Sequence, residues 1–266
     1  MSFICPVCRS PLFKEKKTYI CKNGHNFDIS KNGYVNLLLG SSPKNHGDNK
    51  LMATARRDFL NGGFYEPLKD ALCKKAIDFS KSDDVILDCG CGEGYYTAEI
   101  SQNIKNACVF GTDISKEELA IAARRDCLTS YAVASSFSLP FDDNSVDILL
   151  EIFSPYCGDE FKRVLKKDGI MIMAYPLENH LWELKQAIYD KPYKNEVDES
   201  DLDGFTLVKS EQIKFILNLK SNKDIQNLFM MTPYYYKTSK ADQQKAAKLN
   251  SLAVKAEFGI SVYIKI

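Results

Sequence analysis

The stretch "LDCGCGEGYYT" at residues 87–97 places three glycines between an apolar run and a helical pattern. The run "VILDCG" before the loop is typical of a buried strand, and apolar side chains recur at helical spacing after Tyr95. Glycines at 90, 92 and 94 let the backbone adopt positive φ and let a ligand approach the main chain. A strand, a glycine loop and a helix in this order mark the place where α/β sheets bind nucleotides. The loop therefore predicts a nucleotide-binding α/β domain.

Apolar runs alternate with amphipathic segments on both sides of this loop. Strands are expected at 85–90, 108–114, 128–136, 146–153 and 169–176, with later edge strands at 210–219 and 258–266. Helical patterns cover 51–79, with a break at Gly62–Gly63, and also 94–104 and 116–126. Near-continuous apolar strands that alternate with helices indicate a parallel sheet covered on both faces. We expect a doubly wound, mostly parallel sheet of seven strands.

The spacing of the glycines and two acidic residues indicate which nucleotide is bound. A dinucleotide site has G-x-G-x-x-G, whereas this loop has G-x-G-x-G preceded by Asp88. A carboxylate there would repel a pyrophosphate but suits the cationic amino group of a methionine moiety. Asp113, at the end of "GTDI", is placed to bind both ribose hydroxyls. Residues 83–176 thus resemble the class I S-adenosylmethionine-dependent methyltransferases; a tight structural turn and NAD binding are the less favoured alternatives.

One position departs from that pattern. Many of these methyltransferases carry an Asp four residues before "LPF" that holds the adenine amino group, and here the residue is Ser135. The adenine is then expected to be held by backbone amides near Ser135 and Ser136.

A metal-binding pattern opens the chain. Two pairs of ligands, C-x-x-C and C-x-x-x-H, are joined by a segment of hairpin length, and they comprise Cys5, Cys8, Cys21 and His25. Four strong ligands leave no open position, so we expect a structural zinc site. The predicted organisation is a zinc-binding RNA-recognition domain at 1–38, a linker at 39–50 with the composition "GSSPKNHGDNK", and a methyltransferase domain at 51–266.

Charge and aromatic residues in the first 50 residues point to a polyanion. This segment has eight Lys or Arg and three Asp or Glu, although the whole chain has no net charge. Lysines interleaved with Phe13, Tyr19 and Phe27 suit phosphate contacts and base stacking on RNA that is not a duplex. The alternatives are an ordinary solvated surface and, for Phe27 above all, a place in the small core of the ribbon.

The other cysteines and the apolar runs bear on location. Six cysteines are expected as small core residues in a reducing cytosol: Cys73, Cys89, Cys91, Cys108, Cys127 and Cys157. No apolar run reaches the length of a membrane span, and the N-terminus lacks a signal-peptide pattern, so a cytoplasmic protein is expected.

The arrangement as a whole resembles the RlmA-type 23S rRNA (guanine-N1)-methyltransferase family of bacteria. The matching pieces are "CPVC…YICKNGHNFDISKNGYVNLL", "ARRDFLNGGFYEPL", "LDCGCGEGYYT", "LPF", "HLWELKQAIY" and "MTPYYYK". The resemblance implies transfer of a methyl group from S-adenosylmethionine to N1 of a guanine in a 23S rRNA hairpin loop near the peptide exit tunnel, on the rRNA or a ribosomal precursor. It assigns the four opening ligands to Zn²⁺ and suggests a homodimer. It also places four residues at the cofactor: Tyr65, Gly94, Tyr95 and His180.

The proton on guanine N1 needs an acceptor. Glu151, in "LLEIFSP", is the candidate, and a carboxylate that faces solvent or a helix is the equal alternative. Arg56 and Arg57 are candidates for RNA phosphate contacts or for a solvated helix surface, and one residue of Tyr234–Tyr236 for stacking on the target base. Two other functions remain open: methylation of a small molecule or protein with the ribbon as a partner-binding module, and RNA binding without catalysis.

Overall fold

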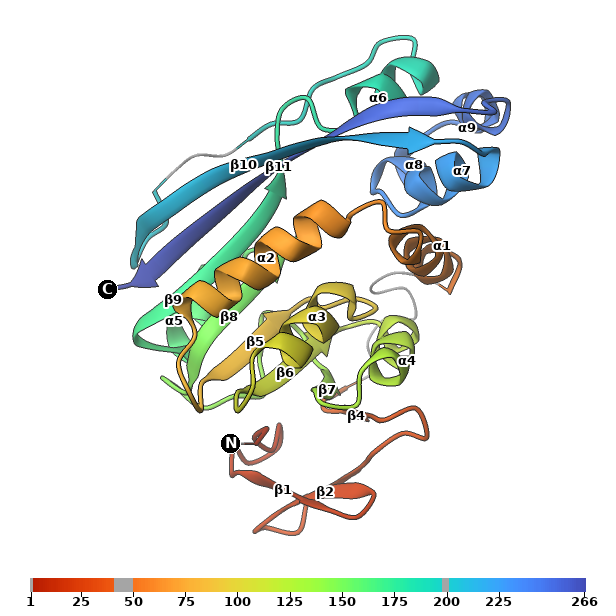
Figure 1. Cartoon of the computed structure of the whole chain (residues 1–266). Coiled ribbons are helices and arrows are strands. Elements are labelled where there is room, and N and C mark those ends of the chain that lie inside the picture. The colour runs from red at the N-terminus through yellow and green to blue at the C-terminus, as the bar shows by residue number, and fades with distance from the viewer. Residues whose placement is uncertain (1, 41–49, 198–200) are drawn as a thin grey trace.

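The structure is a computed structural model that describes residues 2–40, 50–197 and 201–266. Most of the predicted linker at 39–50 lies outside the described residues. A small ribbon at the N-terminal end lies against one side of a large twisted sheet, and helices are distributed around that sheet (Figure 1).

The ribbon contains a three-stranded antiparallel sheet in the order β1-β2-β3. Its strands are β1 (Leu12–Glu15), β2 (Thr18–Cys21) and β3 (Asn26–Asp28). A tight turn with Lys16 at a φ of 52° joins β1 to β2. This hairpin brings the two ends of the segment, where the predicted zinc ligands lie, to the same place.

In the described part of the chain, the main sheet has eight strands in the order β10-β11-β9-β8-β5-β6-β7-β4. They are β4 (Tyr34–Asn36), β5 (Val85–Cys89), β6 (Cys108–Asp113), β7 (Ser130–Val133), β8 (Val146–Ile152), β9 (Leu165–Pro176), β10 (Phe205–Leu219) and β11 (Leu252–Lys265). Neighbouring strands from β4 to β9 are parallel, and β11 runs antiparallel to both β9 and β10. The doubly wound fold and all seven expected strands are confirmed.

The eighth strand comes from the segment that the sequence analysis assigned to the N-terminal unit. β4 extends the sheet beyond β7, with Val35 opposite Ala132. Val35 is almost completely buried, so this short strand adds an apolar side chain to the core as well as backbone hydrogen bonds. A run of three residues has no period of its own, which is why its pairing was missed.

The helices lie on both faces of the sheet and at its end. They are α1 (Lys50–Asn61), α2 (Glu66–Phe79), α3 (Tyr95–Asn103), α4 (Lys116–Arg125), α5 (Gly158–Val164), α6 (Trp182–Ile188), α7 (Asn222–Met230), α8 (Tyr234–Lys237) and α9 (Lys240–Ala247). Alternate residues of β5 divide between two core clusters: Ile86 packs with α2 and α3, and Leu87 packs with α5 and the ribbon. A strand buried on both faces explains the continuous apolar run at 85–89. Among the described residues no helix combines the length and apolar character needed to cross a bilayer.

The ribbon and the sheet share one core. The ring of Phe3 is fully buried, with its centroid 5.1 Å from that of Phe110 and 5.6 Å from that of Phe141. The backbone N–H of Ile4 donates to the carbonyl of Pro140 at 2.9 Å. The ribbon therefore covers apolar surface of the sheet that would otherwise face water, and its removal would expose that surface.

The cysteines differ in part from expectation. All nine are free thiols, and Cys73, Cys89, Cys91 and Cys157 are buried as predicted. Cys108 and Cys127 are exposed, so their expected burial was wrong. Cys108 is the first residue of β6, and Cys127 lies two residues after the end of α4. Both cysteines are therefore at an end of their element, outside the core.

Gly94 is required by packing at the start of α3. Its φ is +77°, and a Cβ at this position would lie 2.9 Å from the Cβ of Ala122 and 3.0 Å from the hydroxyl oxygen of Tyr131. The glycine thus allows α3 to approach α4 and β7 closely.

We expect Gly94→Ala to lower the free energy of unfolding by about 2 to 5 kcal/mol, because it combines a strained left-handed backbone with overpacking. Chemical denaturation measures the change. Gly40→Ala is the matched control, since Gly40 also has positive φ but no atom of the described residues lies within 4 Å of its Cβ position. Equal losses in the two variants would show that backbone strain alone explains the glycine.

Candidate active site

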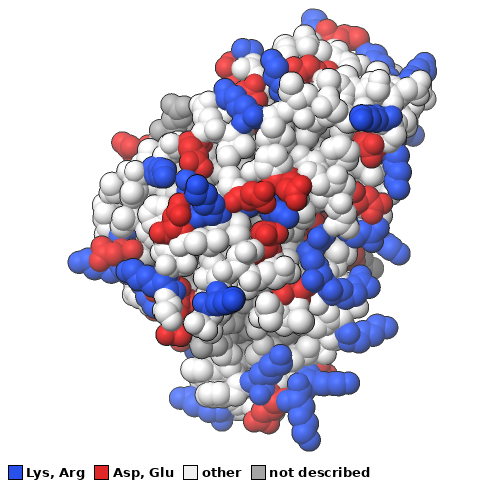
Figure 2. All heavy atoms as spheres, viewed as in Figure 1, with Lys and Arg blue, Asp and Glu red and all other residues white. Residues whose placement is uncertain are grey.

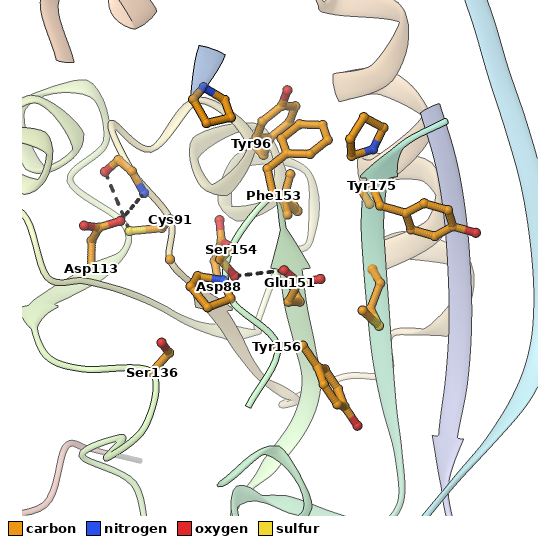
Figure 3. A pocket seen from close by; sticks show the side chains of 18 of the residues that line it. Asp88, Cys91, Tyr96, Asp113, Ser136, Glu151, Phe153, Ser154, Tyr156 and Tyr175 are labelled. Carbon is orange, nitrogen blue, oxygen red and sulfur yellow. Dashed lines mark hydrogen bonds between the residues drawn. The ribbon is translucent and has the colours of Figure 1, made fainter. Parts of the chain in front are cut away.

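A cavity of about 870 Å³ opens at the carboxyl ends of β5, β6 and β8. The chain turns to opposite sides of β5 at this point, to β6 on one side and to β8 on the other, which is where doubly wound sheets bind ligands. Nine of the ten residues predicted to bind the cofactor line the cavity, and so does Glu151. Gly94 does not, because its position is taken up by contacts with α4 and β7. Figure 3 shows Asp113, Asp88 and Glu151 following one another across the cavity.

Backbone hydrogen bonds hold the glycine loop at the base of the cavity. The N–H groups of Gly90 and Cys91 both donate to the carbonyl of Thr112, at 2.8 and 2.9 Å. The N–H of Gly92 donates to one oxygen of Asp113 at 2.9 Å, and the N–H of Ser115 donates to the other at 2.8 Å. The Asp113 carboxylate is therefore fixed at the end of β6, where it was predicted to bind a ribose.

Asp88 presents a buried oxygen to which no described residue donates. Its side chain is almost completely buried, and one oxygen accepts a hydrogen bond from the Thr97 hydroxyl at 2.5 Å, while the other has no hydrogen-bond partner among the described residues. Burial raises the pKa of Asp88 to about 7. An ammonium group in the cavity would donate to this oxygen and stabilise the ionised carboxylate. The residue thus fits the amino group of S-adenosylmethionine.

Tyr65, Tyr95 and the two serines form other parts of the wall. Tyr65, just before α2, is buried edge-on against Phe59 and Phe258. Tyr95 begins α3, with the cations of Lys69 and Arg125 above its ring. The loop after β7 carries Ser135 and Ser136 into the cavity; the Ser135 hydroxyl accepts the N–H of Phe137. These groups can surround the adenosine part of the cofactor.

Glu151 is buried in the cavity wall, which removes the alternative of a carboxylate facing solvent. Its side chain is 3% exposed and accepts a hydrogen bond from the Ser154 hydroxyl at 3.2 Å. Burial, and to a smaller extent the nearby charge of Asp88, raise the pKa of Glu151 to about 7. A carboxyl group with this pKa can exchange a proton at neutral pH.

His180 cannot serve as a base at neutral pH. Its Nδ1 accepts the backbone N–H of Glu257 at 3.1 Å, so the neutral ring carries its proton on Nε2. Burial, with the nearby charge of Lys185, lowers the pKa of His180 to about 3. The ring packs on Phe258 with a centroid distance of 4.4 Å. His180 is therefore a fixed hydrogen-bond donor in the cavity wall.

The two arginines of α1 have partners within the protein. Arg56 lines the cavity, where its Nη1 lies 2.8 Å from Glu118 and its Nη2 donates to the carbonyl of Met231. Arg57 pairs with Asp58. The sequence offered no signal for the role of Arg56 in the wall, because its partners are distant in sequence.

The three tyrosines of α8 also differ in their surroundings. Tyr234 lines the cavity and donates to Asn195, Tyr235 packs on Phe229, and Tyr236 lies outside the cavity with half of its surface exposed.

The four opening residues come together as a metal site. One ligand atom from each of Cys5, Cys8, Cys21 and His25 lies within 4.8 Å of the others. The Sγ atoms of Cys8 and Cys21 are 3.7 Å apart, and His25 Nδ1 is 3.5 Å from the Sγ of Cys5 and 3.4 Å from that of Cys21. A tetrahedral zinc ion with Zn–S bonds of about 2.3 Å has S–S edges of about 3.8 Å, so the spacing fits structural zinc.

The fold and these two sites define a class I S-adenosylmethionine-dependent methyltransferase that carries a zinc ribbon. A family model for a methyltransferase domain matches residues 86–169, and one described as the N-terminal part of RlmA matches residues 3–42. Among solved structures, the crystal structure of the cyclase SpnF aligns with a TM-score of 0.50 at 18% identity, over 74% of this chain and 79% of that one. Its name illustrates that the fold alone does not determine the reaction.

Two curated relatives narrow the assignment. A protein of Bacillus subtilis (strain 168) that is described as the 23S rRNA (guanine-N(1)-)-methyltransferase YxjB is 31% identical to this chain. The alignment covers 99% of this chain and 97% of the relative. The 23S rRNA (guanine(748)-N(1))-methyltransferase of Streptomyces fradiae is 34% identical over 69% of this chain and 66% of its own. The chain belongs to the family of 23S rRNA (guanine-N1)-methyltransferases, which confirms the resemblance noted in its sequence.

We expect Asp88→Asn to weaken binding of S-adenosylhomocysteine by roughly 10- to 100-fold, because the ammonium group loses a charged acceptor. Titration calorimetry with the purified protein measures the affinity. The matched control is 5′-methylthioadenosine, which lacks the amino-acid part and should bind both proteins equally. An equal loss for both ligands would show that Asp88 acts on the shape of the loop and not on the amino group.

Proposed function

We propose that this protein methylates N1 of a guanine in a hairpin loop of 23S rRNA near the peptide exit tunnel. The observation that carries the proposal is the buried Glu151, a carboxyl with a pKa of about 7, in the same cavity as the Asp88 and Asp113 cofactor residues. Guanine N1 is protonated at neutral pH, so its methylation requires an acceptor of this kind. The guanine specificity in the names of the relatives supports the choice of base.

The ribbon supplies the proposed contact with RNA. Phe13 on β1 is 58% exposed, and Lys14, Lys16 and Lys17 are exposed around the same hairpin. Figure 2 shows Lys and Arg side chains projecting from this end of the molecule. Tyr19 is buried and Phe27 is partly buried, so these two belong to the core of the ribbon. Phe13 with its lysines is the proposed stacking and phosphate-binding surface.

The chemistry requires orientation and one proton acceptor. The bound cofactor supplies a methyl group already activated by the positive sulfonium, so no covalent intermediate on the protein is needed. Asp88, Asp113 and the serine loop would hold the donor. Glu151 accepts the N1 proton of the guanine as the new N–C bond forms and the bond between the methyl carbon and sulfur breaks, with its electron pair remaining on sulfur. The attacked atom lies on the Watson–Crick edge, so the guanine must be unpaired or extruded when it enters.

Location and assembly complete the proposal. We place the protein in the cytoplasm, with 23S rRNA or a ribosomal precursor as its partner and a homodimer as its assembly. The rival that methylates a small molecule or protein makes the ribbon a partner-binding module, but lysines around an exposed aromatic ring suit the phosphates and bases of RNA better. A protein that binds RNA without catalysis gives no role to the Asp88 oxygen to which no described residue donates.

Primer extension along 23S rRNA from cells with and without the gene tests the function directly. A methyl group on guanine N1 blocks pairing, so reverse transcriptase is expected to stop one nucleotide before the modified guanine only in cells that carry the gene. Identical patterns of stops would reject this rRNA as the substrate.

We expect the single-turnover rate to fall about tenfold per pH unit below pH 7, because Glu151 accepts a proton only when ionised. Glu151→Gln should lower the rate by about 10²- to 10⁴-fold and remove this midpoint. Rapid-quench assays from pH 5.5 to 9 measure both effects. An unchanged rate in Glu151→Gln would eliminate Glu151 as the acceptor.

Two controls separate catalysis from folding. The exposed Glu117→Gln, outside the cavity, should keep the wild-type profile. The pKa of Glu151 is raised in the folded protein. The wild type therefore loses stability as the pH rises from the pKa of this residue in the unfolded chain through 7, whereas Glu151→Gln does not. At pH 8 this variant should therefore unfold at the same temperature as the wild type or higher.

A further inference from the structure

Tyr175 lies in the cavity one step beyond the proposed proton acceptor. Glu151 on β8 pairs with Met173 on β9, and Tyr175 follows two residues later on the same face. Figure 3 shows Glu151 between Asp88 and Tyr175, so the tyrosine is on the side of Glu151 away from Asp88 and Asp113. A guanine whose N1 proton passes to Glu151 must lie next to that residue, and Tyr175 lines the same cavity.

The ring of Tyr175 lies flat on the neighbouring strand. Its partner on β11 is Gly259, and a Cβ there would lie 2.5 Å from both Cε2 and Cζ of the ring and 2.8 Å from its hydroxyl oxygen. Equal distances to two adjacent ring carbons, with a longer distance to the oxygen, place this point above the ring face and not at its edge. The glycine therefore makes room for the ring, which covers this part of β11 and lines the cavity.

A polar contact fixes the orientation of the ring. The hydroxyl of Tyr175 is 3.1 Å from the hydroxyl of Ser261, which is 3.4 Å from that of Ser210 on β10. The side chain is partly exposed although it rests on the sheet. An aromatic face held from below and at its tip is a rigid surface for a planar ligand.

We propose that Tyr175 is the platform on which the target guanine stacks, so that the Watson–Crick edge of the base faces Glu151. The inference rests on the proposed function. Stacking of a base on an aromatic side chain contributes about 1 to 3 kcal/mol, which is roughly a 5- to 150-fold effect. Gly259 is the positioning residue for this platform, and the role falls to Tyr175 instead of the tyrosines at 234–236.

Four variants test the proposal: Tyr175→Leu, Tyr175→Phe, Gly259→Ala and the control Tyr236→Leu. The first removes the ring, the second keeps it without the Ser261 contact, and the third keeps the tyrosine but forces its ring off the strand. Tyr236 is an exposed tyrosine outside the cavity. Each variant is measured for single-turnover rate on unmodified 23S rRNA and for affinity toward S-adenosylhomocysteine.

We expect Tyr175→Leu to lower the rate at subsaturating RNA roughly 5- to 150-fold, Gly259→Ala to lower it by an intermediate factor, and Tyr175→Phe and Tyr236→Leu to keep it within about threefold. Affinity for S-adenosylhomocysteine should be unchanged in all four. With 2-aminopurine in place of the target guanine in an rRNA hairpin, the wild type and Tyr175→Phe should quench its fluorescence, and Tyr175→Leu should not.

Wild-type rate and quenching in Tyr175→Leu would overturn the platform while leaving the methyltransferase function intact. Failure of the wild type to modify the rRNA would instead refute the proposed function. If Tyr175→Leu does not fold, the pair of Gly259→Ala and Tyr175→Phe decides, since a platform requires the glycine variant to be the slower of the two.

Discussion

The turn after β5 is fixed by hydrogen bonds from the glycine loop to the end of β6, and the geometry of the site depends on them. Two N–H groups converge on the carbonyl of Thr112, and a third holds the carboxylate of Asp113. These bonds can form only because parallel strands end at one edge of the sheet. The same constraint brings Asp88 and Glu151 from neighbouring strands into one cavity, in an environment dry enough to raise both pKa values.

Much of this was accessible from sequence because the signals were local or periodic. The buried strands, the loop, Asp88, Asp113 and the four zinc ligands follow from spacing and side-chain chemistry within short windows. Arg56 and Tyr175 could not be assigned in that way. Their positions depend on Glu118 and Gly259, residues 62 and 84 positions away in the chain, which no local pattern connects.

For a related reason, the structural role of each glycine could be predicted only in part from the sequence. The sequence shows that a glycine loop is present. It does not show whether a ligand, a helix or an aromatic ring occupies the space where the Cβ of another residue would lie. Gly94 makes room for α4, and Gly259 makes room for Tyr175. The exposed Cys108 and Cys127 show the same limit, because a residue at the edge of an apolar element resembles one at its centre until the packing is known.

The pairing of β4 with β7 has a consequence for synthesis on the ribosome. The zinc ribbon and β4 are translated first, yet β4 finds its partner only when residues 131–133 have emerged, roughly 100 residues later. At about 5 to 20 residues per second, the segment waits on the order of 5 to 20 s with Val35 uncovered. A zinc ion bound to the cysteines and the histidine would hold them together during that interval, and the ribbon would then be a preformed template for the edge of the growing sheet.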